Sequence, residues 1–496
     1  MNERIRNKEL CKKVVSAEQA AGLIKDGMLV GTSGFTPSGY PKAVPLALAG
    51  RVRKTGKKVN IGLLTGASVG KELDEALTKA GIVVRRYPYQ TDRAVREGIN
   101  SGKIAYADIH LSHFPQQVRY GFFGKLDLAI VEAAAITEEG NIIPTTSVGA
   151  SPTFVSEAEG VIIEINTSQP LELEGMHDIY HPQDPPYRKP IPLVKPDDRI
   201  GTPYIPVNPE KIKAIVLTDI KDDVRPFAPI DDISRQMAGH LIDFLKKEVS
   251  EGRLPKNLLP LQSGVGSVAN AVLAGLLDSP FENLSFYSEV IQDSVFDLID
   301  NGKIKIASGT SVTPSPQGLI RFYENLKEYK KKIILRPQEI SNHPEIIRRL
   351  GSIAINTAIE VDIYGNVNST NIIGSKIING IGGSGDFARN AYISIFTTPS
   401  VAKNGNISCI VPMVSHVDHT EHDVHVIVTE QGVADLRGLS PRERAKVIIE
   451  NCAHPDYKPL LKDYYQRAVR GKGHTPHIIG EALSWHKRFL EKGTMK

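Results

Sequence analysis

Residues 260–296 read PLQSGVGSVANAVLAGLLDSPFENLSFYSEVIQDSVF, and this stretch decides the fold class. An apolar run broken by Gly264 and Gly266 precedes apolar residues at helical spacing over 269–277, and Leu284–Tyr287 has the composition of a short strand. An amphipathic helix is then predicted to end near residues 301–302. The order strand, glycine turn, helix, strand is typical of α/β folds, and it puts Glu289 at the carboxyl end of a strand.

Glu289 has a functional interpretation and two alternatives. Ligands of open α/β sheets collect outside the carboxyl ends of the strands, so a carboxylate at that place is a candidate for chemistry. It could instead be a helix-start acid that interacts with the helix dipole. In addition, Gly264-x-Gly266-x-x-Ala269 matches the dinucleotide fingerprint, and Glu289 follows at about the 20-residue spacing of a ribose-binding acid. This stretch alone leaves the three open.

The composition is that of an ordinary globular protein. With 496 residues and 41% hydrophobic content, two or more domains are expected. The 60 basic and 56 acidic residues are mixed along the chain, which argues against a nucleic-acid partner. Three distant cysteines suggest neither disulfides nor a CxxC metal site. No signal-like or membrane-length apolar segment is visible, so we expect no membrane contact and a cytoplasmic location.

The chain divides at a proline-dense segment. Before it, β/α pairs alternate, and Leu126–Glu132 and Val161–Ile165 are apolar runs typical of buried parallel strands. Residues 170–210 cannot sustain a helix or a central strand. We therefore predict a first α/β domain over 1–210, which includes this linker, and a second over 211–496, which begins with a strand at Lys213–Thr218.

An internal duplication relates the two halves. At an offset of 200 residues, the segment from Tyr87 to Ile104 aligns with that from Tyr287 to Ile304. Tyr89 then occupies the position of Glu289, so the duplication keeps this carboxylate in one half only. A pure folding requirement explains such asymmetry poorly, which favours a chemical role for Glu289.

Two segments of the second half carry further candidates. The glycine cluster NGIGGSGDFARNA, residues 379–391, suits a phosphate or an oxyanion, and its alternative is a demanding turn. Residues 415–432 contain His416, His419, His422 and His425, each three positions after the last. Strand-like alternation and the lack of cysteine favour polar packing of these histidines over a zinc site. No metal site is therefore predicted. Glu430 closes this strand as a second candidate acid or an ordinary surface carboxylate.

These motifs together resemble the acetyl-CoA hydrolase/transferase family. The resemblance rests on SGVGSVANAVLAGL, FYSEVIQDSVFDLIDNGKIK, RPQEISNHPEIIRRLG, NGIGGSGDFARNAY and the histidine segment, and it covers nearly the full length. It is strongest to the succinyl-CoA:acetate and propionyl-CoA:succinate CoA-transferases of class I. The resemblance implies two related open, mostly parallel α/β domains of the NagB/RpiA-like type with the active site between them, and a homodimer.

The resemblance also implies roles for individual residues. Glu289 would be the nucleophile, with Asn342 and Glu430 as accessory residues and the Gly383 N–H in the oxyanion hole. Ser68 and Arg225 align, less securely, with substrate-contacting positions. CoA would contact the following residues: Gly264, Val265, Gly266, Ser267, Val268, Ile359, Asn379, Gly383 and Lys403.

The implied activity is CoA transfer between a short-chain acyl-CoA and a free carboxylate by ping-pong chemistry through an acyl-glutamyl anhydride and a glutamyl-CoA thioester. Coenzyme A would be a substrate, with no permanently bound cofactor. Acetyl-CoA hydrolysis through the same glutamate is the alternative. An NAD-dependent enzyme and a non-catalytic ligand sensor remain as less favoured hypotheses.

Overall fold

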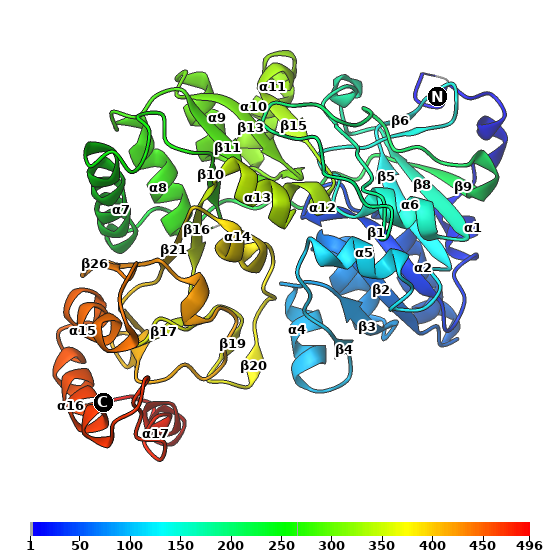
Figure 1. Cartoon of the computed structure of the whole chain (residues 1–496). Helices are drawn as coiled ribbons and strands as arrows, with labels where there is room; N and C mark the ends of the chain where they lie inside the picture. The colour runs from blue at the N-terminus through cyan, green and yellow to red at the C-terminus, as the bar shows by residue number, and fades with distance from the viewer. Residues whose placement is uncertain (1–2, 265) are drawn as a thin grey trace. The chain divides into compact units, whose positions relative to one another are not determined.

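The computed structural model of the chain describes residues 3–264 and 266–496. Helices and strands alternate through most of its length, and the two large sheets are mostly parallel (Figure 1). The chain forms two compact units. The first unit comprises Met1–Pro226, Phe286–Phe296 and Lys305–Leu350. The second unit comprises Phe227–Ser285, Asp297–Ile304 and Gly351–Lys496.

The first unit contains a seven-stranded sheet with the order β4-β3-β2-β1-β5-β8-β9. All neighbouring strands are parallel, and Val30 of the central β1 pairs with Leu63 on one side and Leu128 on the other. The strands are β1 Leu29–Thr36, β2 Ile61–Ser68, β3 Val83–Tyr87, β4 Ala105–Tyr106, β5 Leu128–Ala133, β8 Gly160–Asn166 and β9 Ile212–Thr218.

Helices cover this sheet because its strands are apolar on both faces. One buried core joins the strands to α1 (Ala17–Ala21), α2 (Ala43–Thr55) and α3 (Ala76–Lys79). On β1, a Cβ added at Gly31 would lie 2.7 Å from the ring of Phe154, which belongs to α6 (Ser151–Glu157). Glycine is therefore needed there for close packing of this helix on the strand. The helix α6 also packs on α5 (His113–Arg119).

The later segments of the first unit carry a smaller β/α arrangement. Strand β13 (Ile304–Gly309) pairs in parallel with β15 (Ile333–Leu335), and β12 (Val290–Ile291) pairs in parallel with β14 (Ser311–Val312). Phe296, Phe322 and Tyr329 form an aromatic cluster with centroids 4.8–5.8 Å apart. The helices are α9 Asp293–Asp300, whose residues from Asp297 on belong to the second unit, α10 Pro316–Glu324, α11 Leu326–Lys332, α12 Gln338–Ser341 and α13 Pro344–Leu350.

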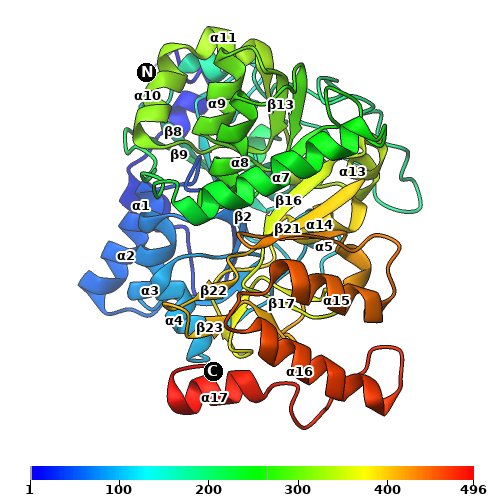
Figure 2. The same ribbon diagram turned by 90° about the vertical axis from the view of Figure 1, so that its left-hand side faces the viewer.

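The second unit has parallel pairing in the order β10-β16-β21-β25, and β26 adds to β25 in antiparallel direction. Figure 2 shows α7 and α8 lying side by side. The elements are β10 Leu261–Ser263, β16 Ile353–Thr357, β21 Ile393–Thr397, β25 Val426–Thr429, β26 Gly432–Asp435, α7 Asp232–Ser250, α8 Ser267–Leu277, α14 Ser384–Asn390, α15 Pro441–Cys452, α16 Lys458–Ala468 and α17 Ser484–Lys492.

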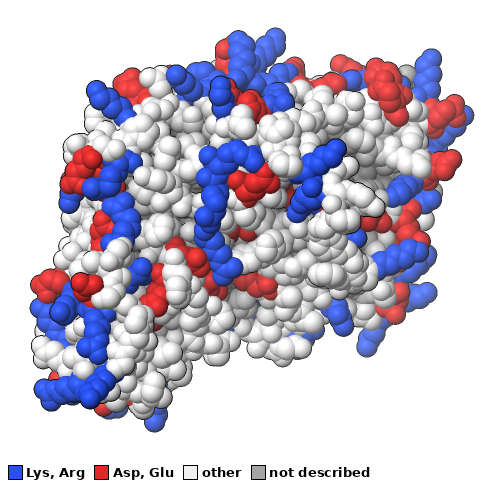
Figure 3. Space-filling view, viewed as in Figure 1, with Lys and Arg blue, Asp and Glu red and all other residues white. Residues whose placement is uncertain are grey.

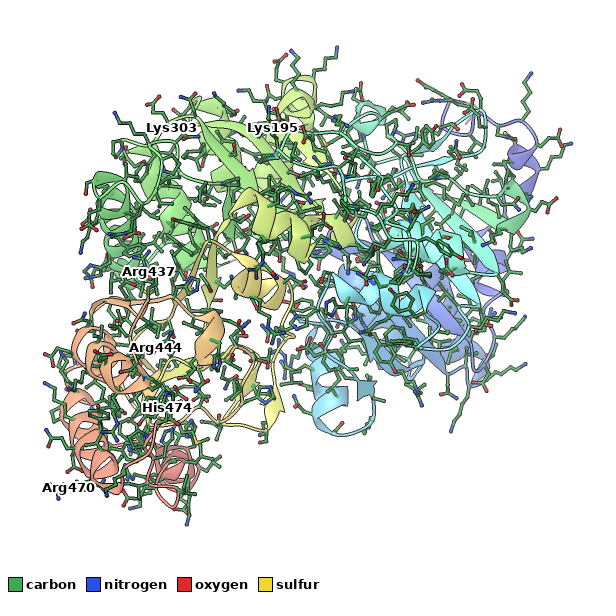
Figure 4. The ribbon with its side chains drawn as sticks, in the orientation of Figure 1. Lys195, Lys303, Arg437, Arg444, Arg470 and His474 are labelled. Carbon is green, nitrogen blue, oxygen red and sulfur yellow. The ribbon has the colours of Figure 1, made fainter. Side chains whose placement is uncertain are left out.

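A buried acid fastens α7 to β26. Glu248 of α7 accepts two hydrogen bonds from Arg437, at 2.8 and 2.9 Å. Arg437, which is labelled in Figure 4, also bonds Asp435 at the end of β26. Glu248 is further bonded to Arg253, and these bonds hold the pKa of its carboxyl at about 2 although burial opposes that shift. The network keeps a charged residue stable among packed elements.

Residues 260–296, around Glu289, fold as the sequence predicts. Strand β10 is followed by a glycine turn, by α8 and by β11 (Leu284–Tyr287), and α9 ends next to the turn at Gly302, whose φ is 72°. A capping box opens α15 as well, with the Ser440 N–H bonded to Glu443 at 2.8 Å. These local patterns suffice because they follow from the helix and strand periods alone.

The proline-dense segment differs from the prediction in one respect. The strand expected to open the second half is β9, and it pairs in parallel with β8 as the edge of the first sheet. The predicted boundary at residue 210 thus separates two strands of one sheet. The segment before β9 packs against its own unit, with Met176 and Ile191 buried and backbone bonds between Ile179 and Thr202. Buried contacts, instead of regular structure, hold it in place.

Strand pairing also changes how the halves align. Strand β10 pairs with β16 as β1 pairs with β5, and each is followed by a helix and the next strand. Strand β11 therefore corresponds to β2, and the 200-residue offset, which matches it to β3, is out of step by one strand. Ser68 is the last residue of β2 and therefore lies at the end of the strand that corresponds to β11.

The surface carries both charges. Figure 3 shows Lys and Arg interspersed with Asp and Glu on the face in view, in line with 60 basic and 56 acidic residues in the sequence. Among the described residues, no helix combines the length and apolar character needed to cross a bilayer.

Candidate active site

Glu289 lies in the first unit, in the short loop between β11 and β12. Its backbone carbonyl accepts bonds from the N–H groups of Thr310 and Ser311, at 2.7 and 3.1 Å. Its side chain accepts a bond from Asn342 Nδ2 to Oε1 at 3.1 Å and one from Ser288 Oγ to Oε2 at 3.3 Å. The residue is only 7% exposed. A carboxylate held on both oxygens has a fixed orientation, which suits a nucleophile.

Asn342 is brought to Glu289 by the short helix α12, which it terminates as the C-cap residue. Asn342 is completely buried, and its N–H donates to the Gln338 carbonyl at 3.0 Å. Two of the four residues predicted as catalytic, Glu289 and Asn342, are therefore in direct contact although 53 positions separate them.

Tyr89 is a neighbour of Glu289 that the sequence identified only as its repeat counterpart. Tyr89 packs against the apolar cluster of Phe35, Ala67, Leu111 and Val290, the residue after Glu289. Burial, with smaller contributions from the charges of Asp108 and Glu289, raises the pKa of the Tyr89 phenol to about 12. The phenol therefore stays protonated at neutral pH. A pattern search overlooks it because its proximity arises between different strands.

The two tentative substrate residues also belong to the first unit. Ser68 ends β2, is completely buried, and its hydroxyl has no hydrogen-bond partner among the described residues. Arg225 is exposed and donates to Asp223 at 2.9 Å. Asp222 is turned away from it, because its carboxylate pairs at 2.8 Å with the buried ammonium of Lys42. Of the two aspartates beside Arg225, Asp223 is thus the one that binds it.

The second unit carries the residues predicted to contact CoA. Gly264 follows β10, and its N–H bonds the Ile355 carbonyl at 3.0 Å. Gly266 has a φ of 124°, a backbone conformation that residues other than glycine rarely adopt. Ser267 and Val268 are the first residues of α8. Val265 lies outside the described residues. Gly266 is exposed, and because it has no side chain a ligand can approach its backbone closely.

Two further predicted CoA contacts lie in the second glycine loop, and a third lies between β16 and β17 (Glu360–Asp362). Gly383 is the N-cap residue of α14, and Gly382 before it has a φ of 57°. Asn379 is half-buried at the start of the loop. Ile359 lies between β16 and β17, where its N–H bonds the Asn368 carbonyl at 2.8 Å. Contact of these three residues with CoA stays a prediction.

Lys403 and Glu430 also lie in the second unit. Lys403 is exposed in the turn between β22 (Val401–Ala402) and β23 (Ile407–Ser408), with a φ of 51° that is uncommon for lysine. Glu430 follows β25 and accepts bonds from the N–H and the hydroxyl of Ser400. Burial alone would raise the pKa of Glu430, but these bonds outweigh it and lower that pKa.

The histidine segment packs as polar structure. His419 is completely buried, its ring lies 4.6 Å from that of Phe396, and its Nε2 lies 3.2 Å from the hydroxyl of Ser384 in α14. Among the described residues, no cluster of three or more potential metal ligands is found. His419 therefore supports the start of α14, next to Gly383. The three-residue spacing of the histidines does not predict this contact.

Both large parts of the chain match models of one family. Residues 1–217 match the acetyl-CoA hydrolase/transferase N-terminal domain, and residues 318–465 match the C-terminal domain of the same family. The fold is that of a two-part α/β enzyme with mostly parallel sheets. The chain belongs to the acetyl-CoA hydrolase/transferase family.

Two curated relatives cover the whole chain. A succinyl-CoA:acetate CoA-transferase of Clostridium kluyveri is 60% identical over 495 residues, which are 100% of this chain and 92% of the relative. An acetyl-CoA hydrolase of Schizosaccharomyces pombe is 50% identical over 514 aligned positions, which cover 100% of this chain and 98% of the relative. Membership of this enzyme family leaves the NAD-dependent and sensor hypotheses without support.

Solved structures share the fold at low identity. RipA from Yersinia pestis matches with a TM-score of 0.70 and 23% identity, over 92% of this chain and 98% of that one. A 4-hydroxybutyrate CoA-transferase from Porphyromonas gingivalis matches with a TM-score of 0.62 and 22% identity over the same shares. The predicted fold class is confirmed.

Proposed function

We propose that this chain transfers coenzyme A between a short-chain acyl-CoA, such as succinyl-, acetyl- or propionyl-CoA, and a free carboxylate, with Glu289 as the nucleophile. The observation that carries the proposal is the hydrogen-bonded, 7% exposed carboxylate of Glu289 at the end of β11. A carboxylate that is oriented and largely removed from water attacks a thioester more effectively than a solvated one.

The proposed reaction has two exchanges at Glu289. Its carboxylate oxygen attacks the acyl carbon of acyl-CoA, and the thiolate leaves, which gives an acyl-glutamyl anhydride. The thiolate then attacks Cδ of Glu289, so that the first carboxylate departs and a glutamyl-CoA thioester remains. The incoming carboxylate reverses both exchanges and leaves as the new acyl-CoA. No proton, electron or further reactant is consumed.

Each exchange passes through an oxyanion that needs hydrogen-bond donors. For attack on the acyl carbon we assign this role to the Gly383 N–H, and for attack on Cδ of Glu289 to Asn342 Nδ2, which already bonds Oε1 at 3.1 Å. One such donor in a site of this kind contributes about 3 to 4 kcal/mol. We assign Glu430 an accessory role and the CoA contacts to the glycine turns and Lys403.

The experiment that tests the proposal incubates the purified chain with succinyl-CoA, with and without acetate, and measures both free thiol and acetyl-CoA. Acetate-dependent acetyl-CoA with little free thiol is the expected result. Glu289→Ala should lower transfer at least about 10⁴-fold, because removal of a covalent nucleophile eliminates the pathway. The variant should keep the wild-type circular dichroism spectrum, and appreciable residual transfer would reject Glu289 as the nucleophile.

Acetyl-CoA hydrolysis is a second candidate function, because a relative with that name is 50% identical over the full chain. It would follow if water reached the anhydride or the thioester before the acceptor acid. Equal thiol release with and without acetate would identify the hydrolase.

We also propose that the protein is cytoplasmic and forms a homodimer. Light scattering after size-exclusion chromatography tests the dimer through its molar mass.

A further inference from the structure

The tip of α12 contains a chain of two hydrogen bonds that leads to Glu289. Ser341, the last residue of α12, donates from its hydroxyl to Asn342 Oδ1 at 2.7 Å. Asn342 Nδ2 in turn donates to Glu289 Oε1 at 3.1 Å. Ser341 and Asn342 are both completely buried, so water does not compete for either bond.

The first bond decides which end of the Asn342 amide meets Glu289. The two ends of a carboxamide have nearly the same shape, and only their partners distinguish oxygen from nitrogen. If the Asn342 amide were turned over, Oδ1 would face a carboxylate oxygen, and two acceptors would repel each other. The same turn would set Nδ2 opposite the Ser341 hydroxyl. Donation from Ser341 to Oδ1 thus favours the orientation in which Nδ2 reaches Glu289.

The hydroxyl of Ser341 can act in this way because α12 is held on several sides. Tyr287 Oη donates to the Ile340 carbonyl at 2.7 Å. Gln338 is bonded through its N–H to the Gly149 carbonyl at 2.9 Å and through Nε2 to the Leu111 carbonyl at 3.0 Å. The other acceptor near the Ser341 hydroxyl, the Gln338 carbonyl, lies at 3.4 Å. The shorter bond to Asn342 is therefore favoured.

We propose that Ser341 is a positioning residue for the reaction, which fixes the Asn342 amide so that Nδ2 donates to Glu289. The inference rests on the proposed function of Glu289 and extends it to a residue that touches no substrate. Asn342 Nδ2 meets the oxygen on which negative charge develops when Cδ of Glu289 is attacked. Ser341 therefore affects formation and breakdown of the glutamyl-CoA thioester, with little effect on CoA binding.

A double-mutant cycle tests this role. Ser341→Ala should lower kcat about tenfold, the kinetic equivalent of one hydrogen bond, and leave KM for acyl-CoA within about twofold. In an Asn342→Ala background the same substitution should change kcat less than about twofold, since no amide remains to be oriented. A full tenfold loss in that background would overturn the proposal. Thermal unfolding of all four proteins checks that the comparison is between folded states.

Two further variants separate orientation from stability. Ser352→Ala is the matched control, because Ser352 is also completely buried and its hydroxyl has no hydrogen-bond partner among the described residues; kcat should not change. Ser341→Thr keeps a hydroxyl and should recover most of the lost activity. An equal loss of kcat in Ser352→Ala, or no recovery by a folded Ser341→Thr, would show that Ser341 acts through general packing.

Trapping the intermediate distinguishes failure of this inference from failure of the proposed function. After mixing with acyl-CoA, borohydride reduction of a glutamyl-CoA thioester converts Glu289 to an alcohol that peptide mass spectrometry detects. Wild type should form this product rapidly, and Ser341→Ala about tenfold more slowly. No product on Glu289 in wild type would reject the proposed function, whereas equal rates in both proteins would reject the role of Ser341 alone.

Discussion

At the scale of single residues, hydrogen-bond partners distinguish the roles of charged side chains. Glu430 follows a strand in the same manner as Glu289, but its carboxylate accepts bonds from the N–H and hydroxyl of Ser400 and from Nε2 of Gln431. Arg225 lies at the surface with Asp223 as its partner. The sequence identified these three residues as charged and suitably placed, and their surroundings give each a different role.

Glu430 should make stability sensitive to acid. The bonds from Ser400 lower its pKa below the usual value of 4.5 in spite of burial. A carboxyl with a lowered pKa in the folded state stabilises the fold above its unfolded pKa, and this contribution is lost as pH falls through the lower, folded value. Urea unfolding from pH 7 to pH 3 should therefore show a flatter loss of stability in Glu430→Gln than in wild type. Ser400→Ala should flatten it partly, and identical slopes in all three proteins would contradict the assignment.

Arg225 should select dicarboxylic substrates. Arg225→Ala should raise KM for succinate about tenfold or more and leave acetate kinetics unchanged, because loss of one charge-assisted hydrogen bond weakens binding by about 1.5 to 3 kcal/mol. Exposed pairs contribute at most about 1 kcal/mol to stability, so unfolding should hardly shift. Arg235→Ala removes a comparable surface pair, with Asp232, and is the control. An unchanged preference between succinate and acetate would refute the role.

At the scale of elements, α12 is too short to be stable alone and is held by an ion-pair network. Glu339 of α12 accepts bonds from Nη1 and Nη2 of Arg119, at 2.7 and 2.8 Å, and from Arg188 at 3.2 Å. Arg119 also bonds Asp184 in the proline-dense segment at 2.9 Å. A segment that lacks regular structure therefore helps to place the helix that ends at Asn342.

Arg119→Ala should destabilise the fold strongly. It would leave Glu339, whose side chain is 3% exposed, with Arg188 as its remaining partner in the network, and breaking a buried pair costs about 3 to 5 kcal/mol. Urea unfolding measures this loss. Lys79→Ala, which removes an exposed pair with Glu75, should cost less than about 1 kcal/mol. Similar losses in the two variants would contradict the structural role of the network.

At the scale of the whole molecule, the predicted functions fall on different units. Glu289, Asn342, Ser68 and Arg225 belong to the first unit, whereas both glycine turns, Lys403 and Glu430 belong to the second. The proposed reaction needs both groups. Binding of the distant nucleotide of CoA can then contribute to catalysis at Glu289, since remote binding energy is available in the transition state.

Hydrogen exchange should reveal this division of roles. Saturating free CoA should slow exchange in peptides that cover residues 264–270 and 379–388 of the second unit, because a bound ligand shields the glycine turns. Glu289→Ala should show the same protection, since it removes chemistry and keeps the CoA contacts. Peptides within α7 serve as the internal reference. Absence of protection at both glycine turns would reject the proposed CoA contacts.

The sequence by itself determined the α/β class, the strand, glycine turn and helix around Glu289, and the family to which the chain belongs. Periodicity and turn residues act over a few positions, and long motifs are specific, so neither needs the tertiary structure. The approximate limits of β5 and β8 followed in the same way.

Only the tertiary structure decided which residues meet. It added β9 to the first sheet, matched β11 to β2 in the repeat, set Tyr89 near Glu289 and joined Ser341, Asn342 and Glu289 through hydrogen bonds. Parallel strands separated by whole helices bring distant positions to one sheet edge, and a short helix such as α12 depends on its surroundings for its place. Local sequence carries no record of such contacts, because the packed fold creates them.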